Sequence, residues 1–139
     1  EEHYGALLKK TGGAVRANIS NSSKLGQSLI YKILKDPNHK ELKENSVKLM
    51  KARYSRVREA IGAYPEDAVL KPLPFNSGYF MTFVVEGKSA EALRLLLLDE
   101  YGIGTISIQD KYLRVAYSSV DEENIEPLFK LLEEAAEKL

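Results

Sequence analysis

The stretch VRANISNSSKLGQSL, residues 15–29, brings an arginine, several small polar residues and a lysine close together along the chain. A lysine in surroundings rich in Ser and Gly can act as a Schiff-base nucleophile, which makes Lys24 a candidate catalytic residue. Arg16 offers different chemistry, because a guanidinium can hold a carboxylate in two parallel hydrogen bonds. Its plainer interpretation is a solvated loop residue, and the stretch by itself does not decide between these roles.

A second arginine, Arg114, stands between apolar residues in the segment YLRVAY, which has the composition of a short strand. An arginine there must face solvent or a binding partner, because burying an unpaired charge is costly. It is therefore either an ordinary outward-facing residue or a fork that binds a carboxylate. Gly78, in NSGYF, also has two interpretations: a turn residue, or a point where the backbone approaches a ligand closely.

Composition narrows the classes of function. The chain has 139 residues, a formal net charge of +0 and no cysteine, so we expect no nucleic-acid partner, no disulfide and a reducing, cytoplasmic location. His3 and His39 are far apart among charged residues, so we expect no metal site. The longest apolar run, ALRLLLL, is too short to cross a membrane. The sequence contains no Ser-His-Asp set and no phosphate-binding Gly-rich loop, and we expect no signal peptide.

The first half of the chain predicts three helices. The first covers residues 2–10 and stops at Thr11-Gly12-Gly13, and residues 16–24 are expected to be irregular. The second begins after a cap among residues 21–23 and ends at Asp36-Pro37. The third, residues 38–61, is longer than a small domain needs at about 1.5 Å per residue, so we expect it to bridge two domains.

The second half changes to a β-α-β-β-α pattern. GYFMTFVVEG reads as a strand, SAEALRLLLLDEYG as a helix with a Ser cap and a Gly stop, and IGTISIQ and YLRVAYS as strands around a turn at Asp110-Lys111. A closing helix follows, with Ser119 and Glu122 placed as a capping box and Pro127 near its start. The predicted fold class is α+β, a small mixed sheet backed by helices and preceded by the long helix.

The order of four segments carries a resemblance to a known family. They are VRANISNSS.LGQSLIYKIL, M.AR...VREAI, NSGYFMTF and YGIGTISIQDKYLRVAYSSVDEENIEPL. Together they resemble the C-terminal part of fold-type I, pyridoxal-phosphate-dependent aminotransferases, nearest to the aspartate and aromatic amino acid branch. The resemblance implies that residues 1–37 end a large cofactor-binding domain, that residues 38–62 form the interdomain helix, and that residues 63–139 form the C-terminal small domain.

The resemblance also implies a role for particular residues. Arg114 matches the arginine that binds the α-carboxylate of the substrate. Arg16 matches the arginine that, in dicarboxylate-specific members, reaches across the homodimer to the distal carboxylate in the partner's site. Ser20 matches a serine near the partner's cofactor phosphate, and Gly78 and Phe80 match a strand that lines the substrate pocket. The segment around Arg16 departs from the family pattern, since Ile19 replaces a usual tyrosine and Ser22-Ser23 a usual proline pair.

By the same resemblance Lys24 is not the Schiff-base lysine, which in the family lies upstream in an S-x-K-x-x-G segment. We therefore expect no catalytic residue in this chain, and no activity from the chain alone. The parent enzyme is expected to bind pyridoxal 5'-phosphate and to transfer an amino group between an amino acid and a 2-oxo acid. The alternatives are a lyase or decarboxylase on the same scaffold, a free-standing α+β binding domain, or an interaction module.

Overall fold

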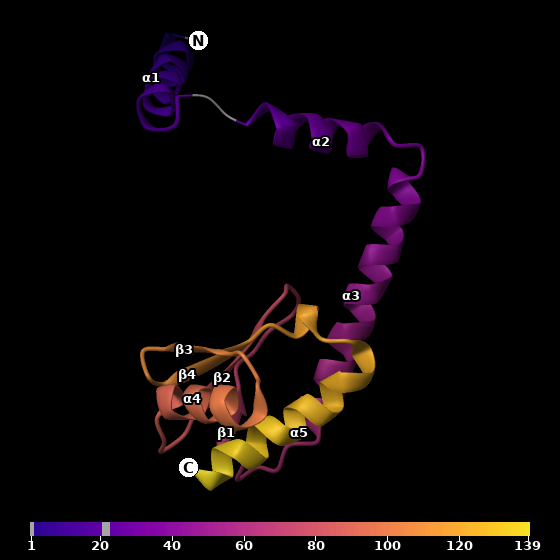
Figure 1. The fold of residues 1–139 in the computed structure, drawn as a ribbon, viewed down its shortest axis with the longest axis vertical. Helices are drawn as coiled ribbons and strands as arrows, with labels where there is room; N and C mark the ends of the chain where they lie inside the picture. The colour runs from indigo at the N-terminus through magenta and orange to yellow at the C-terminus, as the bar shows by residue number, and fades with distance from the viewer. Residues whose placement is uncertain (1, 21–22) are drawn as a thin grey trace. The chain divides into compact units, whose positions relative to one another are not determined.

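The computed structural model describes residues 2–20 and 23–139 (Figure 1). The chain divides into two units, Glu1–Lys43 and Glu44–Leu139, and the boundary lies inside the long helix α3, His39–Gly62. This helix matches the predicted range of residues 38–61 to within one residue at each end.

The first unit contains α1 (Glu2–Asn18), α2 (Lys24–Lys35) and the start of α3. Ser23 caps α2 as the sequence predicted, because its side chain accepts a hydrogen bond from the backbone N–H of Gly26. The helix ends at Asp36, directly before the proline that the prediction used as its stop. None of the described residues of α1 and α2 is buried.

The predicted end of the first helix at Thr11-Gly12-Gly13 is wrong, because α1 continues to Asn18. Glycine costs a helix only about 1 kcal/mol relative to alanine, and here neither glycine takes the left-handed conformation that ends a helix. The left-handed conformation occurs later, at Ser20, whose φ is 63°. Arg16 therefore lies in the last turn of a helix, where the sequence predicted an irregular loop.

The second unit is built on a four-stranded sheet with the order β1-β2-β4-β3. Its strands are β1 (Leu70–Pro72), β2 (Met81–Val85), β3 (Ile106–Ile108) and β4 (Tyr112–Val115). The sheet with its helices confirms the α+β class. The predicted mixed sheet is wrong, because every neighbouring pair of strands is antiparallel. The prediction also missed β1, whose three residues end in a proline, a residue confined to edge strands.

The core lies on one face of this sheet. Residues of β2 alternate, so that Met81, Phe83 and Val85 are buried while Thr82 and Val84 face the other side. Buried side chains from α4 (Ala90–Tyr101), α5 (Glu122–Lys138) and α3 join them, and Figure 1 shows α4 and α5 beside the sheet. The opposite face of the sheet carries Thr82 and its cross-strand neighbour Arg114, and it is partly exposed to solvent.

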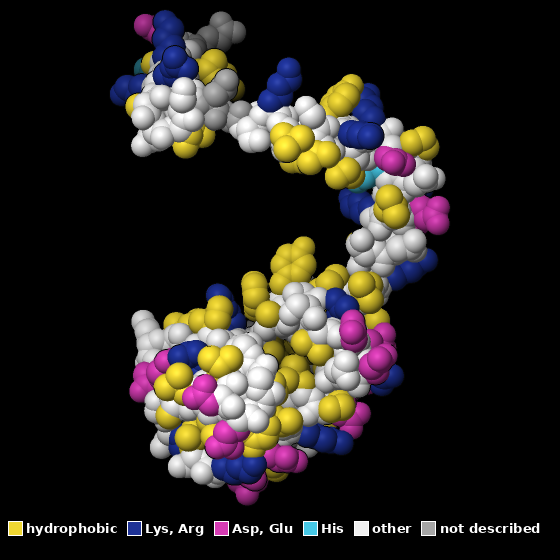
Figure 2. All heavy atoms as spheres, viewed as in Figure 1, with side chains coloured by type: hydrophobic (Ala, Val, Ile, Leu, Met, Phe, Trp, Pro, Cys, Tyr) yellow, Lys and Arg dark blue, Asp and Glu magenta, His cyan; other side chains and the backbone are white. Residues whose placement is uncertain are grey.

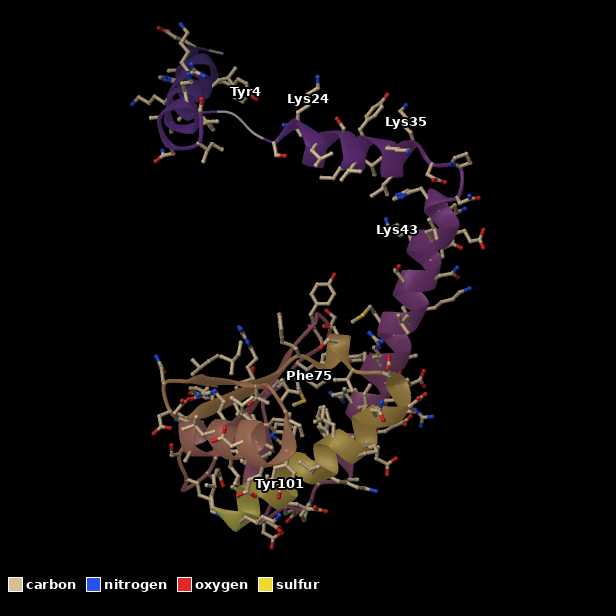
Figure 3. All side chains as sticks on the ribbon, viewed as in Figure 1. Tyr4, Lys24, Lys35, Lys43, Phe75 and Tyr101 are labelled. Carbon is tan, nitrogen blue, oxygen red and sulfur yellow. The ribbon has the colours of Figure 1, made fainter. Side chains whose placement is uncertain are left out.

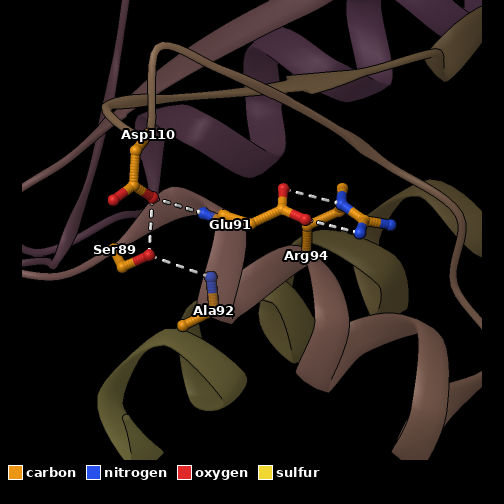
Figure 4. Close-up of polar contacts among 5 residues, drawn as sticks. All are labelled: Ser89, Glu91, Ala92, Arg94 and Asp110. Carbon is orange, nitrogen blue, oxygen red and sulfur yellow. Dashed lines mark hydrogen bonds and ion pairs between the residues drawn. The ribbon is translucent and has the colours of Figure 1, made fainter.

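Both ends of α4 follow the sequence prediction. Ser89 caps the helix by accepting from the backbone N–H of Ala92, and Gly102 ends it with a left-handed φ of 66°. Asp110, in the turn between β3 and β4, accepts hydrogen bonds from the Ser89 hydroxyl at 2.5 Å and from the backbone N–H of Glu91 at 2.8 Å (Figure 4). The strand turn and the helix start are thus fixed to each other.

The predicted capping box at Ser119 and Glu122 is wrong. Tyr117–Ser119 forms a short 3-10 turn, η1, and α5 begins one turn later, after Asp121. The Ser119 hydroxyl donates instead to the carbonyl of Ala116, which keeps it in the turn. Pro127 lies inside the second turn of α5, further in than a first-turn proline, without ending the helix.

Candidate functional site

Arg114 lies on the open face of the sheet, on β4, between Thr82 of β2 and Ile106 of β3. Its guanidinium carbon stands 4.8 Å from the centre of the Phe80 ring, at the distance of a cation–π contact. Among the described residues no hydrogen bond or ion pair involves Arg114, and its Nε is buried without a partner. A guanidinium that packs on an aromatic ring and has no hydrogen-bond partner among the described residues can bind an anion through its N–H groups.

The segment that carries Gly78 and Phe80 is held by residues of η1 (Tyr117–Ser119), which follows β4 and Arg114 in the chain. The hydroxyl of Tyr117 donates to the Gly78 carbonyl at 2.6 Å, and the backbone N–H of Ser118 donates to the Tyr79 carbonyl at 3.3 Å. Gly78 has a φ of 99°, which a residue with a Cβ rarely adopts. Nothing lies within 4 Å of an added Cβ there, so backbone conformation, not space, calls for glycine.

Tyr117 is a residue of this site that the sequence prediction did not single out. Its side chain is 1% exposed, and its ring meets Phe75 with the ring centres 6.0 Å apart. Phe75 in turn contacts Tyr54 of α3, and it is labelled in Figure 3. Burial raises the pKa of the Tyr117 hydroxyl, which therefore stays a neutral donor to Gly78. The available signal that this ring faces the core was the alternation of Leu113, Val115 and Tyr117, which continues past the end of β4.

Arg53 connects the long helix to the same end of the sheet. Its guanidinium donates to the carbonyl of Ser118 in η1 and forms an ion pair with Asp121 at 3.2 Å. Its side chain is 14% exposed, and its Nε, like that of Arg114, is buried without a partner in the part of the chain that the structure describes. No local pattern in the sequence signals this contact, because the partners are more than 60 residues apart along the chain.

The other predicted site residues lie in the first unit. Arg16 donates from Nη1 to the hydroxyl of Ser20 at 3.1 Å, and both side chains are exposed. Lys24 begins α2 and points away from the helix into solvent (Figure 3). The structure therefore places Arg114, Gly78 and Phe80 together in one unit, and Arg16 and Ser20 together in the other.

A cavity of about 480 Å³ lies between the end of α3 and α5, and several glutamates line it. Its inward polar groups already serve the fold. The Tyr64 hydroxyl donates to the Phe129 carbonyl, and the Glu133 carboxylate accepts from the backbone N–H groups of Val69 and Leu70. No set of His, Cys, Asp and Glu in the described ranges could hold a metal ion. Among the described helices, none combines the length and the apolar character that crossing a membrane requires.

Comparison with known proteins gives one family. The model of the family described as aminotransferase class I and II matches residues 7–132. The fold is similar to that of LysN, an α-aminoadipate aminotransferase from Thermus thermophilus complexed with N-(5'-phosphopyridoxyl)-L-leucine, with a TM-score of 0.79 and 20% identity over 96% of this chain and 36% of that one. It is also similar to an aminotransferase from Anaerococcus prevotii, with a TM-score of 0.75 and 21% identity over 99% of this chain and 32% of that one.

A third similar structure is the kynurenine aminotransferase of Pyrococcus horikoshii, in complex with PMP, with KYN as substrate and KYA as product. The TM-score is 0.78 and the identity 17%, over 96% of this chain and 35% of that one. The chain thus spans about a third of the length of these solved chains. No protein with a curated description gives a significant match.

Proposed function

The chain belongs to the class I and II aminotransferase family, and we propose that it acts as the C-terminal part of a pyridoxal-phosphate-dependent enzyme. That enzyme transfers an amino group between an amino acid of the aspartate or aromatic type and a 2-oxo acid. The observation that carries the proposal is the guanidinium of Arg114, which stands over Phe80 without a hydrogen-bond partner among the described residues. A small anion with two acceptor oxygens matches its free edge.

In this proposal Arg114 binds the α-carboxylate of the substrate. Two parallel hydrogen bonds fix both the distance and the rotation of a carboxylate, which a single ammonium does not. Orientation matters because the Cα–H bond must point in one direction for its proton to leave. When bound, pyridoxal phosphate supplies the electron sink that makes this proton acidic. The Schiff-base lysine is not assigned to this chain, so the chain alone is proposed to be inactive.

Arg16 and Ser20 form the second part of the proposal. In a homodimer, Arg16 would bind the distal carboxylate of a dicarboxylic substrate in the partner's site, and Ser20 would donate its hydroxyl to the cofactor phosphate there. The chemistry of the pair is suitable, because an exposed hydroxyl that accepts from a guanidinium leaves its own proton free for a phosphate oxygen. The helical position of Arg16 replaces the loop position that the sequence predicted.

We propose the matching division of the chain as well. Residues 1–37 would end the large cofactor-binding domain, residues 38–62 would be the interdomain helix, and residues 63–139 would be the small domain. A cytoplasmic enzyme that binds neither nucleic acid nor membrane is consistent with the balanced charge of the chain.

Two substitutions in the full-length enzyme test the site. Arg114→Lys keeps the charge but loses the paired geometry, so kcat/KM should fall about ten- to a hundred-fold with every amino acid donor. Arg16→Lys should lower kcat/KM for aspartate and leave an aromatic donor nearly unchanged. Full activity of Arg114→Lys on both donors would refute the carboxylate site. An equal loss on both donors in Arg16→Lys would make that residue structural.

A further inference from the structure

The contact that holds Arg114 is made with the aromatic ring of Phe80. The guanidinium carbon stands over that ring, 4.8 Å from its centre, and no described residue forms a hydrogen bond or an ion pair with the guanidinium N–H groups. The distinction matters because a carboxylate binds the edge of a guanidinium, through its N–H groups. A glutamate or aspartate that fixed Arg114 would compete with the substrate, whereas an aromatic ring does not.

We propose that Phe80 is a positioning residue that acts on the substrate through Arg114. This inference rests on the proposed function, in which Arg114 binds the α-carboxylate. An arginine side chain loses conformational entropy when it is held in one rotamer. If the ligand itself has to order the side chain, this entropy loss weakens binding. The Phe80 ring restricts the guanidinium before the substrate arrives, so a smaller loss of rotamer freedom remains to oppose binding. Phe80 is thus assigned a role in orienting the arginine and not in touching the substrate.

Phe80 can do this because its own position is fixed from both sides. On its N-terminal side, Gly78 accepts from the Tyr117 hydroxyl and Tyr79 accepts from the backbone of Ser118. On its C-terminal side, β2 begins at Met81 and places Thr82 directly opposite Arg114. The ring therefore comes from the residue directly before β2 and the guanidinium from β4, and backbone hydrogen bonds fix the register of these two neighbouring strands.

Tyr112 provides a matched control. It lies two residues before Arg114 on β4 and opposite Val84, so its side chain is on the same face of the sheet. Its ring is paired with Lys111, at 5.4 Å from Nζ, and not with Arg114. Replacing Tyr112 thus removes an aromatic ring from the same face without removing the ring under the arginine.

The test is a double-mutant cycle in the full-length enzyme loaded with pyridoxal phosphate, read as kcat/KM for an amino acid donor. Phe80→Leu alone should lower kcat/KM about two- to tenfold, the range of a cation–π contact, and Phe80→Tyr should restore it. In an Arg114→Ala background, Phe80→Leu should cost nothing further, because its effect passes through the arginine. Tyr112→Leu should change kcat/KM less than about twofold in either background.

Each outcome decides a separate point. Equal costs of Phe80→Leu with and without Arg114 would mean that the ring touches the substrate directly, and would overturn this inference alone. An Arg114→Ala variant with full activity would overturn the proposed function itself.

The variants are chosen so that the protein still folds. Phe80 is 46% exposed, so Phe80→Leu is expected to fold. Tyr117→Phe is the second variant: it keeps the buried ring, removes only the hydrogen bond to Gly78, and should lower kcat/KM only where Arg114 is present.

Discussion

The two units of the chain contain similar helices with different surroundings. In α2 the apolar side chains recur every three or four residues, yet all are exposed: Leu25, Leu29, Ile30 and Ile33. In α5 the same spacing gives Ile125, Phe129 and Leu132, and these are fully buried. Figure 2 shows hydrophobic side chains standing uncovered along α2. The pattern therefore identifies the face that a helix can bury, while burial itself requires a partner.

The hydrogen bonds of the two units differ in the same way. In the first unit, side-chain bonds such as Thr11 to Leu7 and Arg16 to Ser20 join residues four positions apart. The second unit has such local bonds too, but several of its side-chain bonds join distant segments, as Glu133 does with Leu70 across 63 positions. Local bonds stabilise one helix at a time, whereas distant bonds make elements unfold together. We therefore expect the second unit to dominate cooperative unfolding of the chain.

Truncation of a core ring should give the largest effect. Phe83 is fully buried between Tyr64 and Phe129, so Phe83→Ala should lower the free energy of unfolding by about 3–5 kcal/mol. Leu29→Ala, on the exposed face of α2, should change it by less than about 0.5 kcal/mol. Denaturant unfolding of the 139-residue chain measures both. Similar losses in the two variants would show that α2 has a buried face after all.

The carboxylate of Glu133 should give the next largest effect. It accepts from the backbone N–H groups of Val69 and Leu70 at 2.6 and 3.0 Å and is 9% exposed, so it anchors β1 to α5. Glu133→Gln leaves one of these N–H groups without an acceptor, which should cost about 1–3 kcal/mol. Glu134→Gln, at the neighbouring exposed position, is the matched control and should be nearly neutral. An equal cost in both would remove the special role of Glu133.

Comparison of the two units also explains what the sequence could predict. Signals read from neighbouring residues worked well: the caps Ser23 and Ser89, the stop at Gly102 and the long helix α3 all lie where they were predicted. Glycine as a helix stop failed at Gly12-Gly13, because neither residue adopts the left-handed conformation. The strand β1 was missed because three residues carry almost no periodicity.

The candidate site divides along the same line. Arg114, Gly78 and Phe80 belong to motifs that the sequence displays, and in the structure Phe80 contacts Arg114 while Gly78 bonds to Tyr117, three residues after Arg114. Their supports, Tyr117 and Arg53, make contacts across 39 and more than 60 positions, and no local pattern encodes such a pairing. The sequence therefore indicates which residues can bind a ligand, but it does not indicate which other residues hold them in place.

Matched removal of two helix caps sharpens the comparison. Ser89→Ala should lower the free energy of unfolding by about 1 kcal/mol, because α4 contributes Leu93 and Leu97 to the core. Ser23→Ala removes the equivalent bond from α2 and should leave the cooperative transition in place. Its effect should appear instead as faster amide hydrogen exchange in the first turn of α2. A shifted transition in Ser23→Ala would place α2 within the cooperative unit.

The smallest expected effect concerns pH and the turn that fixes α4 to the sheet. Hydrogen bonds from the Ser89 hydroxyl, first, and from the Glu91 backbone lower the pKa of Asp110 below its ordinary value of 3.8. A carboxyl whose pKa is depressed by folding stabilises the fold fully above its unfolded pKa and loses this contribution as the pH falls through its folded pKa. The free energy of unfolding of Asp110→Asn should therefore differ most from that of the parent chain near about pH 6. This difference should shrink by about pH 3, and urea unfolding at both pH values measures it.

The Ser89→Ala background is the control, because it removes the principal cause of the pKa shift. In that background, the part of the free-energy difference that depends on pH should become smaller. A gap that stays constant between the two pH values would mean that the Asp110 carboxylate does not stabilise the junction through its charge.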